Sequence, residues 1–306
     1  MACPPRWLRL GTGAAHAYNR RMKASFADRL AVLPQYLLPK QALTQLAGRL
    51  ARAQGGRWTT WAITRFVARY GIRMEEAAEP RASGYASFND FFTRALREGA
   101  RPLAKAPLLC PVDGAISQCG PLQAGQLLQA KGHHYSAQAL LGGDADLAER
   151  LQGGHFATLY LSPRDYHRIH MPCEGRLKRM VHVPGALFSV NPVTARGVPD
   201  LFARNERLVC EFAGPAGDFV MVLVGATIVG SMATVWHGVV NPPRPGQLRR
   251  WDYGEEGPVL RQGEEMGRFL LGSTVIVLCP AGVWHLPTDW QAGRSVRMGE
   301  AMGLPG

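Results

Sequence analysis

The 306-residue sequence lacks the signatures of several common protein classes. Its six cysteines contain no CxxC pair and no spacing typical of a zinc site, so we expect reduced, mostly structural thiols in a cytosolic compartment. There is no GxGxxG and no P-loop, and hence no indication of a nucleotide site. The amino-terminal MACPPRWLRLGTG has no apolar stretch long enough for a secretory signal.

Acidic side chains are almost missing from the first seventy residues, which carry twelve basic residues and only one acid, Asp28. The net charge of the whole chain is +12, so the remainder is nearly neutral. A basic N-terminal region followed by a nearly neutral remainder favours binding to an anionic surface, either a membrane or a nucleic acid. A solvated helical N-terminus without such a partner is the plainer alternative. The basic residues are Arg6, Arg9, Arg20, Arg21, Lys23, Arg29, Lys40, Arg49, Arg52, Arg57, Arg65 and Arg69.

One run, residues 219–243, contains no Asp, Glu, Lys or Arg and is long enough to span a bilayer as a helix. However, three glycines interrupt it, and β-branched residues dominate its apolar content. These features favour two buried strands that turn near residues 225–230 over one membrane helix.

The hydrophobic period divides the chain into three parts. Residues 1–25 read as a loose leader. Residues 26–107 read as a helical segment, with apolar residues at helical spacing in 43–50 and 63–70, a break around Pro34 and Pro39, and a further helix over 87–98. From residue 108 to 306, short β-type runs alternate with Gly, Pro and Asn. We therefore predict an α+β fold, in which an N-terminal amphipathic helical segment packs on a mainly antiparallel β core.

Three short segments contain candidate catalytic residues: 110–114 (CPVDG), 160–172 (YLSPRDYHRIHMP) and 263–274 (GEEMGRFLLGST). Each has an ordinary explanation on its own, as a turn, as histidines at a strand edge, or as a turn that enters a strand. A Ser, a His and an Asp occur in almost any chain of this length, so their presence alone is weak support for a triad.

Together and in this order, the three segments resemble the phosphatidylserine decarboxylase family. Four further segments match the same family, namely residues 85–92, 131–136, 184–192 and 201–207. The resemblance covers about residues 26–290, and Leu-Gly-Ser-Thr at 271–274 matches the self-cleavage motif of the bacterial and mitochondrial branch. No family catalytic position departs from the pattern.

This resemblance implies that the chain is a proenzyme that cuts itself between Gly272 and Ser273. Asp113, His170 and Ser273 would form the maturation triad, in which His170 takes the proton of Ser273 as the hydroxyl attacks Gly272. A glycine suits the cut because it can adopt the strained backbone that exposes its carbonyl. The products would be a β chain, 1–272, and an α chain, 273–306, that stay together as a heterodimer, with a higher oligomer left open.

The resemblance also implies the reaction of the mature enzyme. Ser273 would become a covalent pyruvoyl group, which forms a Schiff base with phosphatidylserine and accepts electrons as CO2 leaves and phosphatidylethanolamine forms. Neither pyridoxal phosphate nor a metal would be needed. His167 would protonate the carbanion or contact the head group, and Tyr160 is a further candidate to line that site.

Phosphatidylserine lies in a membrane, so we expect a peripheral protein on the cytoplasmic face of the cell membrane and no nucleic-acid partner. The basic residues would attract the lipid surface, and eight apolar side chains would insert. Three alternatives remain: a Ser-His-Asp hydrolase, although a GxSxG elbow is missing; a lipid-binding protein without activity; and a pyruvoyl enzyme that acts on another, soluble amino compound. The eight side chains are Leu37, Leu38, Leu43, Leu46, Leu50, Trp58, Trp61 and Phe66.

Overall fold

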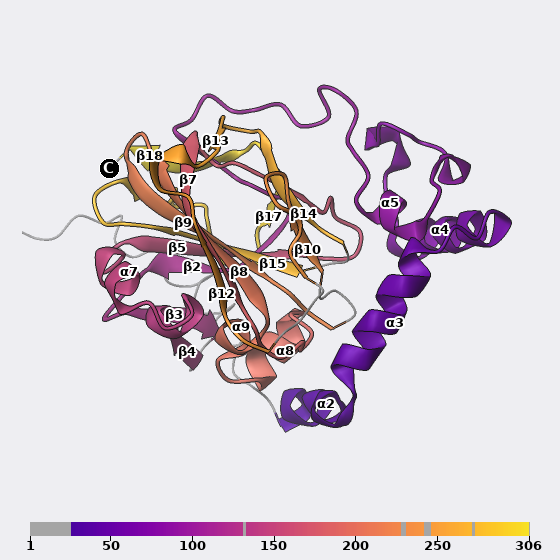
Figure 1. Ribbon diagram of the computed structural model, residues 1–306, viewed down its shortest axis with the longest axis horizontal. Coiled ribbons are helices and arrows are strands. Elements are labelled where there is room, and N and C mark those ends of the chain that lie inside the picture. The colour runs from indigo at the N-terminus through magenta and orange to yellow at the C-terminus, as the bar shows by residue number, and fades with distance from the viewer. Residues whose placement is uncertain (1–25, 131–132, 228–230, 242–245, 271–272, 306) are drawn as a thin grey trace, which may run out of the picture.

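N-terminal helices flank a body of antiparallel sheets in the computed structural model (Figure 1). The structure describes residues 26–130, 133–227, 231–241, 246–270 and 273–305. The expected loose leader, 1–25, lies outside this range. The α+β class and the mainly antiparallel β core are confirmed.

Most of the longer helices precede the sheets. Pro39 stands at the start of α3, and Gly71 closes α4 in the left-handed conformation at φ +63°, which costs little without a Cβ. Short helices and turns connect the strands. The helices are α2 (Phe26–Leu37), α3 (Lys40–Arg52), α4 (Arg57–Tyr70), α5 (Phe88–Phe92), α6 (Ala137–Leu140), α7 (Ala145–Arg150), α8 (Pro192–Gly197) and α9 (Leu201–Arg204), with 3-10 turns η2 (Met74–Glu76), η3 (Ala82–Gly84) and η4 (Gly254–Glu256).

A large sheet forms the centre of the body, with strand order β12-β7-β8-β9-β15-β5-β2-β17 and β13 beside β7. Smaller sheets run β11-β10-β14-β6, β1-β18-β16 and β3-β4. The strands are β1 (Leu108–Leu109), β2 (Gly114–Pro121), β3 (Gln126–Ala130), β4 (His133–Ser136), β5 (His155–Leu161), β6 (Arg168–His170), β7 (Gly175–Val183), β8 (Arg207–Gly214), β9 (Gly217–Val224), β10 (Met232–Thr234), β11 (Gly238–Val239), β12 (Arg249–Asp252), β13 (Val259–Leu260), β14 (Glu265–Phe269), β15 (Ser273–Cys279), β16 (Trp284–His285), β17 (Ser295–Val296) and β18 (Ala301–Pro305).

The large sheet is apolar on both faces. Along β15, Val275 and Val277 enter one core cluster, whereas Ile276 and Leu278 enter the other. Side chains alternate along a strand, so a sheet covered on both sides needs a continuous apolar run. This explains the first part of the uncharged run 219–243, which forms β9. The rest of the run forms β10 and β11 of the four-stranded sheet, and β11 is exposed. The expected buried strands are thus confirmed for β9 and β10, and the expected turn lies partly in 228–230, outside the described residues. Within the described range, no helix is both long and apolar enough to cross a bilayer.

The N-terminal helices pack on the body at two places. At one end, α2 packs on α8, where Asp28 forms an ion pair with Arg196 and Gln35 accepts a hydrogen bond from the backbone of Ser189. At the other end, both α3 and α4 contact α5, and Phe92 of α5 packs against His167 of the body. Figure 1 shows α3 between these two points, standing away from the large sheet.

The two amphipathic stripes of these helices differ in what covers them. In α4 the stripe is covered, because Ile63 is fully buried and Phe66 packs edge-on against Phe88 at 5.0 Å between ring centroids. Phe66 is thus partly buried against α5, unlike the other side chains expected to insert into a membrane. The apolar stripe of α3 faces out instead, since Leu46 and Leu50 are exposed. The other apolar side chains expected to insert are also exposed, namely Leu37, Leu38, Leu43, Trp58 and Trp61.

Two local expectations are wrong in detail. Pro34 lies inside α2 rather than breaking the helix. The helix expected over 87–98 starts as predicted, with Ser87 accepting a hydrogen bond from the backbone of Asp90, but it ends at Phe92. It stops because Leu96 forms a β-bridge with Ala77 and the chain turns toward the body.

Candidate active site

Three strand ends meet at one edge of the large sheet. The last residue of β5, Leu161, pairs with Ser273, the first residue of β15. The neighbouring residue Tyr160 pairs with Ala115, so the start of β2, which directly follows Asp113, lies at the same edge. An added Cβ at Gly114 would come within 2.3 Å of the carbonyl oxygen of Tyr160, which explains why a glycine follows Asp113. The antiparallel register thus brings the 113, 160 and 273 regions together.

The expected cleavage site lies where the chain passes between two sheets. Strand β14 belongs to the four-stranded sheet, and β15 belongs to the large one. Gly272 lies outside the described residues, and of Ser273 only the backbone is described. The backbone of Phe269 donates a hydrogen bond to the carbonyl oxygen of His167 at 3.1 Å, so the histidine segment runs beside the strand that leads to the site.

Asp113 is buried and held by other partners than the expected histidine. Its carboxylate receives hydrogen bonds from Arg101 Nε at 2.9 and 3.1 Å and from the backbone nitrogen of Met298 at 2.9 Å. Arg101 also forms an ion pair with Glu76 at 2.7 Å. In the state described here, Asp113 is therefore part of an arginine-carboxylate cluster.

His170 has a partner on each ring nitrogen. Its Nδ1 lies 2.8 Å from the carbonyl oxygen of Gly263, which can only accept, so Nδ1 carries the proton. Its Nε2 therefore accepts a hydrogen bond from the hydroxyl of Tyr166, at 3.0 Å. Burial lowers the pKa of His170, against the opposing effects of the Gly263 bond and of Glu265. The ring is thus a neutral base with its lone pair on Nε2, and a backbone carbonyl fixes the tautomer.

His167 has the same tautomer but an open lone pair. Its Nδ1 donates to the carbonyl oxygen of Asp165 at 2.8 Å, and its Nε2 has no hydrogen-bond partner among the described residues. The side chain is 0% exposed and lies against Phe92, with ring centroids 4.1 Å apart. Burial lowers its pKa to about 3, so the ring is neutral near pH 7. A buried acceptor without a partner is unfavourable, and it marks a position suited to a proton donor.

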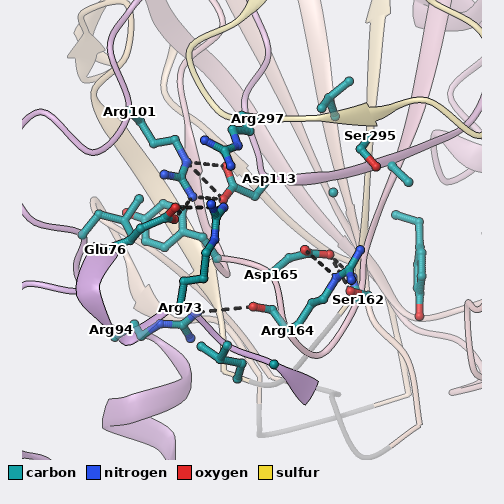
Figure 2. A pocket seen from close by; sticks show the side chains of 18 of the residues that line it. Arg73, Glu76, Arg94, Arg101, Asp113, Ser162, Arg164, Asp165, Ser295 and Arg297 are labelled. Carbon is teal, nitrogen blue, oxygen red and sulfur yellow. Dashed lines mark hydrogen bonds and ion pairs between the residues drawn. The ribbon is translucent and has the colours of Figure 1, made fainter. Parts of the chain in front are cut away.

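A cavity of about 550 Å³ opens beside these groups (Figure 2). Asp113 and Tyr160 line it, as do Asp165 and Tyr166, which hold His167 and His170. Figure 2 shows the pair of Arg101 with Asp113 on one wall and that of Ser162 with Asp165 on another. Of the predicted residues, only Asp113 and Tyr160 line this cavity, whereas His167 and His170 lie behind Asp165 and Tyr166. Asp113 and His170 are each bonded to other groups and not to one another.

Sequence reasoning missed three residues of this region: Arg94, Arg101 and Tyr166. Arg94 was hidden by the helix predicted over 87–98, because on a longer helix it would be one more solvated charge. Since the helix ends at Phe92, Arg94 turns inward and is buried. Tyr166 stands four residues before His170 and was visible in the motif, but nothing in the spacing indicated a hydrogen bond.

The described residues contain no group of three or more His, Cys, Asp or Glu that could hold a metal ion. The five described cysteines, which exclude Cys3, form no disulfide.

Comparison with known proteins identifies the family. A family model described as phosphatidylserine decarboxylase matches residues 88–304, and one described as PSD matches residues 30–71. A phosphatidylserine decarboxylase proenzyme of Acidovorax ebreus is 70% identical over 90% of this chain and 98% of its own length. Proenzymes of the same name from Albidiferax ferrireducens and Dechloromonas aromatica are 68% and 64% identical, each over 90% of this chain and 97% and 98% of their own lengths. The chain therefore belongs to the phosphatidylserine decarboxylase family.

Proposed function

We propose that this chain is a self-cleaving proenzyme whose mature form converts phosphatidylserine to phosphatidylethanolamine and CO2. The observation that carries the proposal is the position of Ser273. It begins a central strand directly after the Leu-Gly pair of the family motif, at the sheet edge that also carries Asp113 and Tyr160.

Maturation starts at Ser273. Its hydroxyl attacks the carbonyl carbon of Gly272, the peptide nitrogen leaves, and an ester joins the two residues. A base then removes the Cα proton of residue 273, and elimination breaks the bond between Cβ and the ester oxygen. This step leaves a carboxylate on Gly272 and a dehydroalanine at position 273. Water adds to the imine form of that residue, ammonia leaves, and a pyruvoyl group remains at the start of the α chain.

His170 is our candidate for the base in this reaction. The Gly263 carbonyl already holds the tautomer that a base needs, so this role does not require a direct bond from Asp113. The Tyr166 hydroxyl must leave Nε2 before the serine hydroxyl can take its place. Asp113 favours the protonated imidazole by its charge, and Arg101 keeps that carboxylate in position.

The residues around position 273 fit a pyruvoyl group. This group supplies the electron sink that decarboxylation of an amino acid needs and that no ordinary side chain provides. Pairing with β5 and β9 holds the strand that would carry it. His167 offers the open Nε2 in a buried environment, so we assign it to the handling of a proton during decarboxylation, and Tyr160 to the wall of the substrate cavity.

The two products of the cut stay together as a heterodimer. The α chain, 273–306, contributes β15 to the centre of the large sheet, β17 to its edge beside β2, and β18 beside β1. Separation would break these ladders and expose the apolar residues of β15 to water.

We propose that α2 to α4 dock the enzyme on the cytoplasmic face of an anionic membrane. A surface helix normally turns its apolar stripe toward the core, but α3 turns it outward. Leu37 is 88% exposed and Trp58 is 78% exposed. Exposed arginines lie on the same helices, and each one near an anionic leaflet contributes about 1 kcal/mol. Such a helix lies in the interface and does not span it.

A decarboxylation assay tests the proposed function. Purified protein is mixed with vesicles that contain carboxyl-labelled phosphatidylserine, and released CO2 and phosphatidylethanolamine are measured. Wild-type protein should produce both in equal amounts, and Ser273→Ala should produce neither. Ser83→Ala, at an exposed serine outside the cavity, is the matched control and should retain activity. Activity in Ser273→Ala would overturn the proposal.

A further inference from the structure

Arg94 is a buried cation that forms no salt bridge with the described residues, although the charges of Asp113 and Asp165 act on it. Its residue is only 5% exposed, and its Nε and Nη1 have no hydrogen-bond partner among the described residues. Its remaining nitrogen, Nη2, makes one long hydrogen bond of 3.4 Å to the carbonyl oxygen of Arg164. The guanidinium also lies 5.3 Å from the ring centroid of Phe91. Most of its hydrogen-bonding capacity is therefore unused.

Arg207 shows how the same fold treats another buried arginine. That side chain is 3% exposed, yet all three of its guanidinium nitrogens donate to backbone carbonyl oxygens. A buried charge is unfavourable unless hydrogen bonds or an opposite charge compensate it. Burial lowers the pKa of both arginines, so the two differ in their hydrogen bonds and not in the direction of this shift. The contrast between the two residues indicates that Arg94 has donors left for a partner beyond the described residues, such as a bound ligand.

The cavity beside Arg94 is suited to an anion. Five arginines and three carboxylates line it, and Figure 2 shows Arg94 on its wall. The carboxylates are already engaged: Asp113 with Arg101, Glu76 with Arg73 and Arg101, and Asp165 with Ser162. The excess of positive charge in the cavity therefore remains for a ligand.

The proposed substrate has two anionic groups, a carboxylate and a phosphodiester. They differ in whether they keep their charge during the reaction. The carboxylate loses its charge as it leaves as CO2. A guanidinium bound to it would stabilise the ground state more than the transition state and would slow the reaction. The phosphodiester keeps its charge throughout and lies only three bonds from the carbon that loses CO2.

We propose that Arg94 binds the phosphodiester of the substrate head group and thereby selects phosphorylated serine over free serine. This inference rests on the proposed decarboxylase function. Nε and Nη1 of the guanidinium have no partner among the described residues, and each can donate a charge-assisted hydrogen bond to a phosphate oxygen.

Steady-state kinetics of Arg94→Met and Arg94→Lys test the assignment. Charge-assisted hydrogen bonds of this kind correspond to about 10- to 100-fold in affinity. For Arg94→Met we expect KM to rise by about that factor while kcat changes by less than about threefold, since the contact is equal in ground and transition states. Arg94→Lys keeps the charge and should lie between. Arg81→Met, at an exposed arginine of the same segment, is the matched control and should leave KM unchanged.

Binding of fragments separates the two anionic groups without any turnover. Glycerophosphoglycerol carries a phosphodiester but neither amine nor carboxylate, and lactate carries only the carboxylate. In calorimetric titrations, glycerophosphoglycerol should bind wild-type protein and Arg81→Met, and should bind Arg94→Lys more weakly. If Arg94→Met does not fold, this comparison of wild type with Arg94→Lys still decides.

Three results would overturn the proposal. One is Arg94-dependent binding of lactate but not of glycerophosphoglycerol, which would assign Arg94 to the carboxylate. Another is a fall in kcat with KM unchanged. The third is folded Arg94→Lys that stays an uncut precursor, which would assign Arg94 to maturation. Failure of the proposed function would look different, because wild-type protein itself would stay uncut or release no CO2.

Discussion

The β core buries its apolar side chains, whereas the N-terminal helices leave many of theirs exposed. In the core, both faces of the large sheet are covered, and even the polar Thr158 and Thr274 of its central strands are fully buried. On α3 and the adjoining ends of α2 and α4, leucines and tryptophans face outward. The helical stripe of α4 is covered by α5, whereas the equivalent stripe of α3 is not. An amphipathic pattern thus determines the helix, but not what covers its apolar face.

We propose that the two regions have separate tasks, chemistry in the core and docking by the helices. If the division holds, substitutions in the core abolish maturation or turnover and leave membrane binding intact. Substitutions on the exposed helical faces do the reverse.

The largest effect should come from His170→Ala. Loss of the base should slow self-cleavage by at least about 10³-fold, so that the precursor remains one chain on a denaturing gel. Flotation with phosphatidylserine vesicles should be unchanged. His285→Ala, at an exposed histidine, should mature normally. Normal maturation of His170→Ala would remove His170 from the proposed triad.

His167→Ala tests whether His167 and His170 have different roles. We expect at least partial maturation, because His170 retains its own tautomer contact with Gly263, but a loss of about 10²- to 10⁴-fold in decarboxylation. Chain separation on a gel and CO2 release from the same sample check both parts. An unprocessed His167→Ala protein would refute the separate role, and the open Nε2 would then point to maturation instead.

The triple variant Leu37→Ser, Trp58→Ser, Trp61→Ser tests the docking side of the comparison. Loss of three inserting side chains should weaken vesicle binding by roughly 100-fold or more, while maturation proceeds normally. The matched control carries serine at Val235, Val239 and Leu248, which are exposed apolar residues of the β body. Equal losses in the two triple variants would show that binding does not depend on the helices.

High salt should release part of the wild-type protein, because charge attraction is screened.

The smallest effect concerns pH. Neutral His170 is the proposed base, and burial lowers its pKa below the usual value of about 6.5. The facing charges are Glu265, Arg168 and Asp113, and the first and last of them oppose this shift. The base form therefore persists as pH falls to 6.5, and self-cleavage of freshly made precursor should change by less than about twofold between pH 8 and 6.5. A decline centred near pH 7 would contradict a lowered pKa. Quenched time courses of precursor loss measure the rate.

Much of the architecture could be predicted from the sequence because it depends on local periodicity. The uncharged run 219–243, rich in β-branched residues, predicted buried strands, and β9 within it is buried on both faces. Ser87 predicted the start of α5 correctly. The end of α5 could not be predicted, because the bridge between Leu96 and Ala77 is a long-range contact without a local signal.

The sequence predicted which residues belong to the candidate site but not the hydrogen bonds and ion pairs that they form. Family resemblance indicated Asp113 and His170, and the register of β2, β5 and β15 explains why the 113 and 273 regions are neighbours. The ion pair of Asp113 with Arg101 and the bond from His170 to Gly263 depend on which groups the fold places within hydrogen-bond distance of these two side chains. Tertiary packing determines these contacts, and the spacing of residues along the chain does not predict it.

Self-cleavage at Ser273 is the central claim, and an intact mass spectrum under denaturing conditions tests it most directly. Wild-type protein should give two chains, residues 1–272 and 273–306, with the smaller one lighter than its encoded mass by the change from an amino-terminal serine to pyruvoyl. Ser273→Ala should give one chain of full mass. A single full-length wild-type chain that nevertheless releases CO2 from phosphatidylserine, or a cut at another bond, would contradict the account.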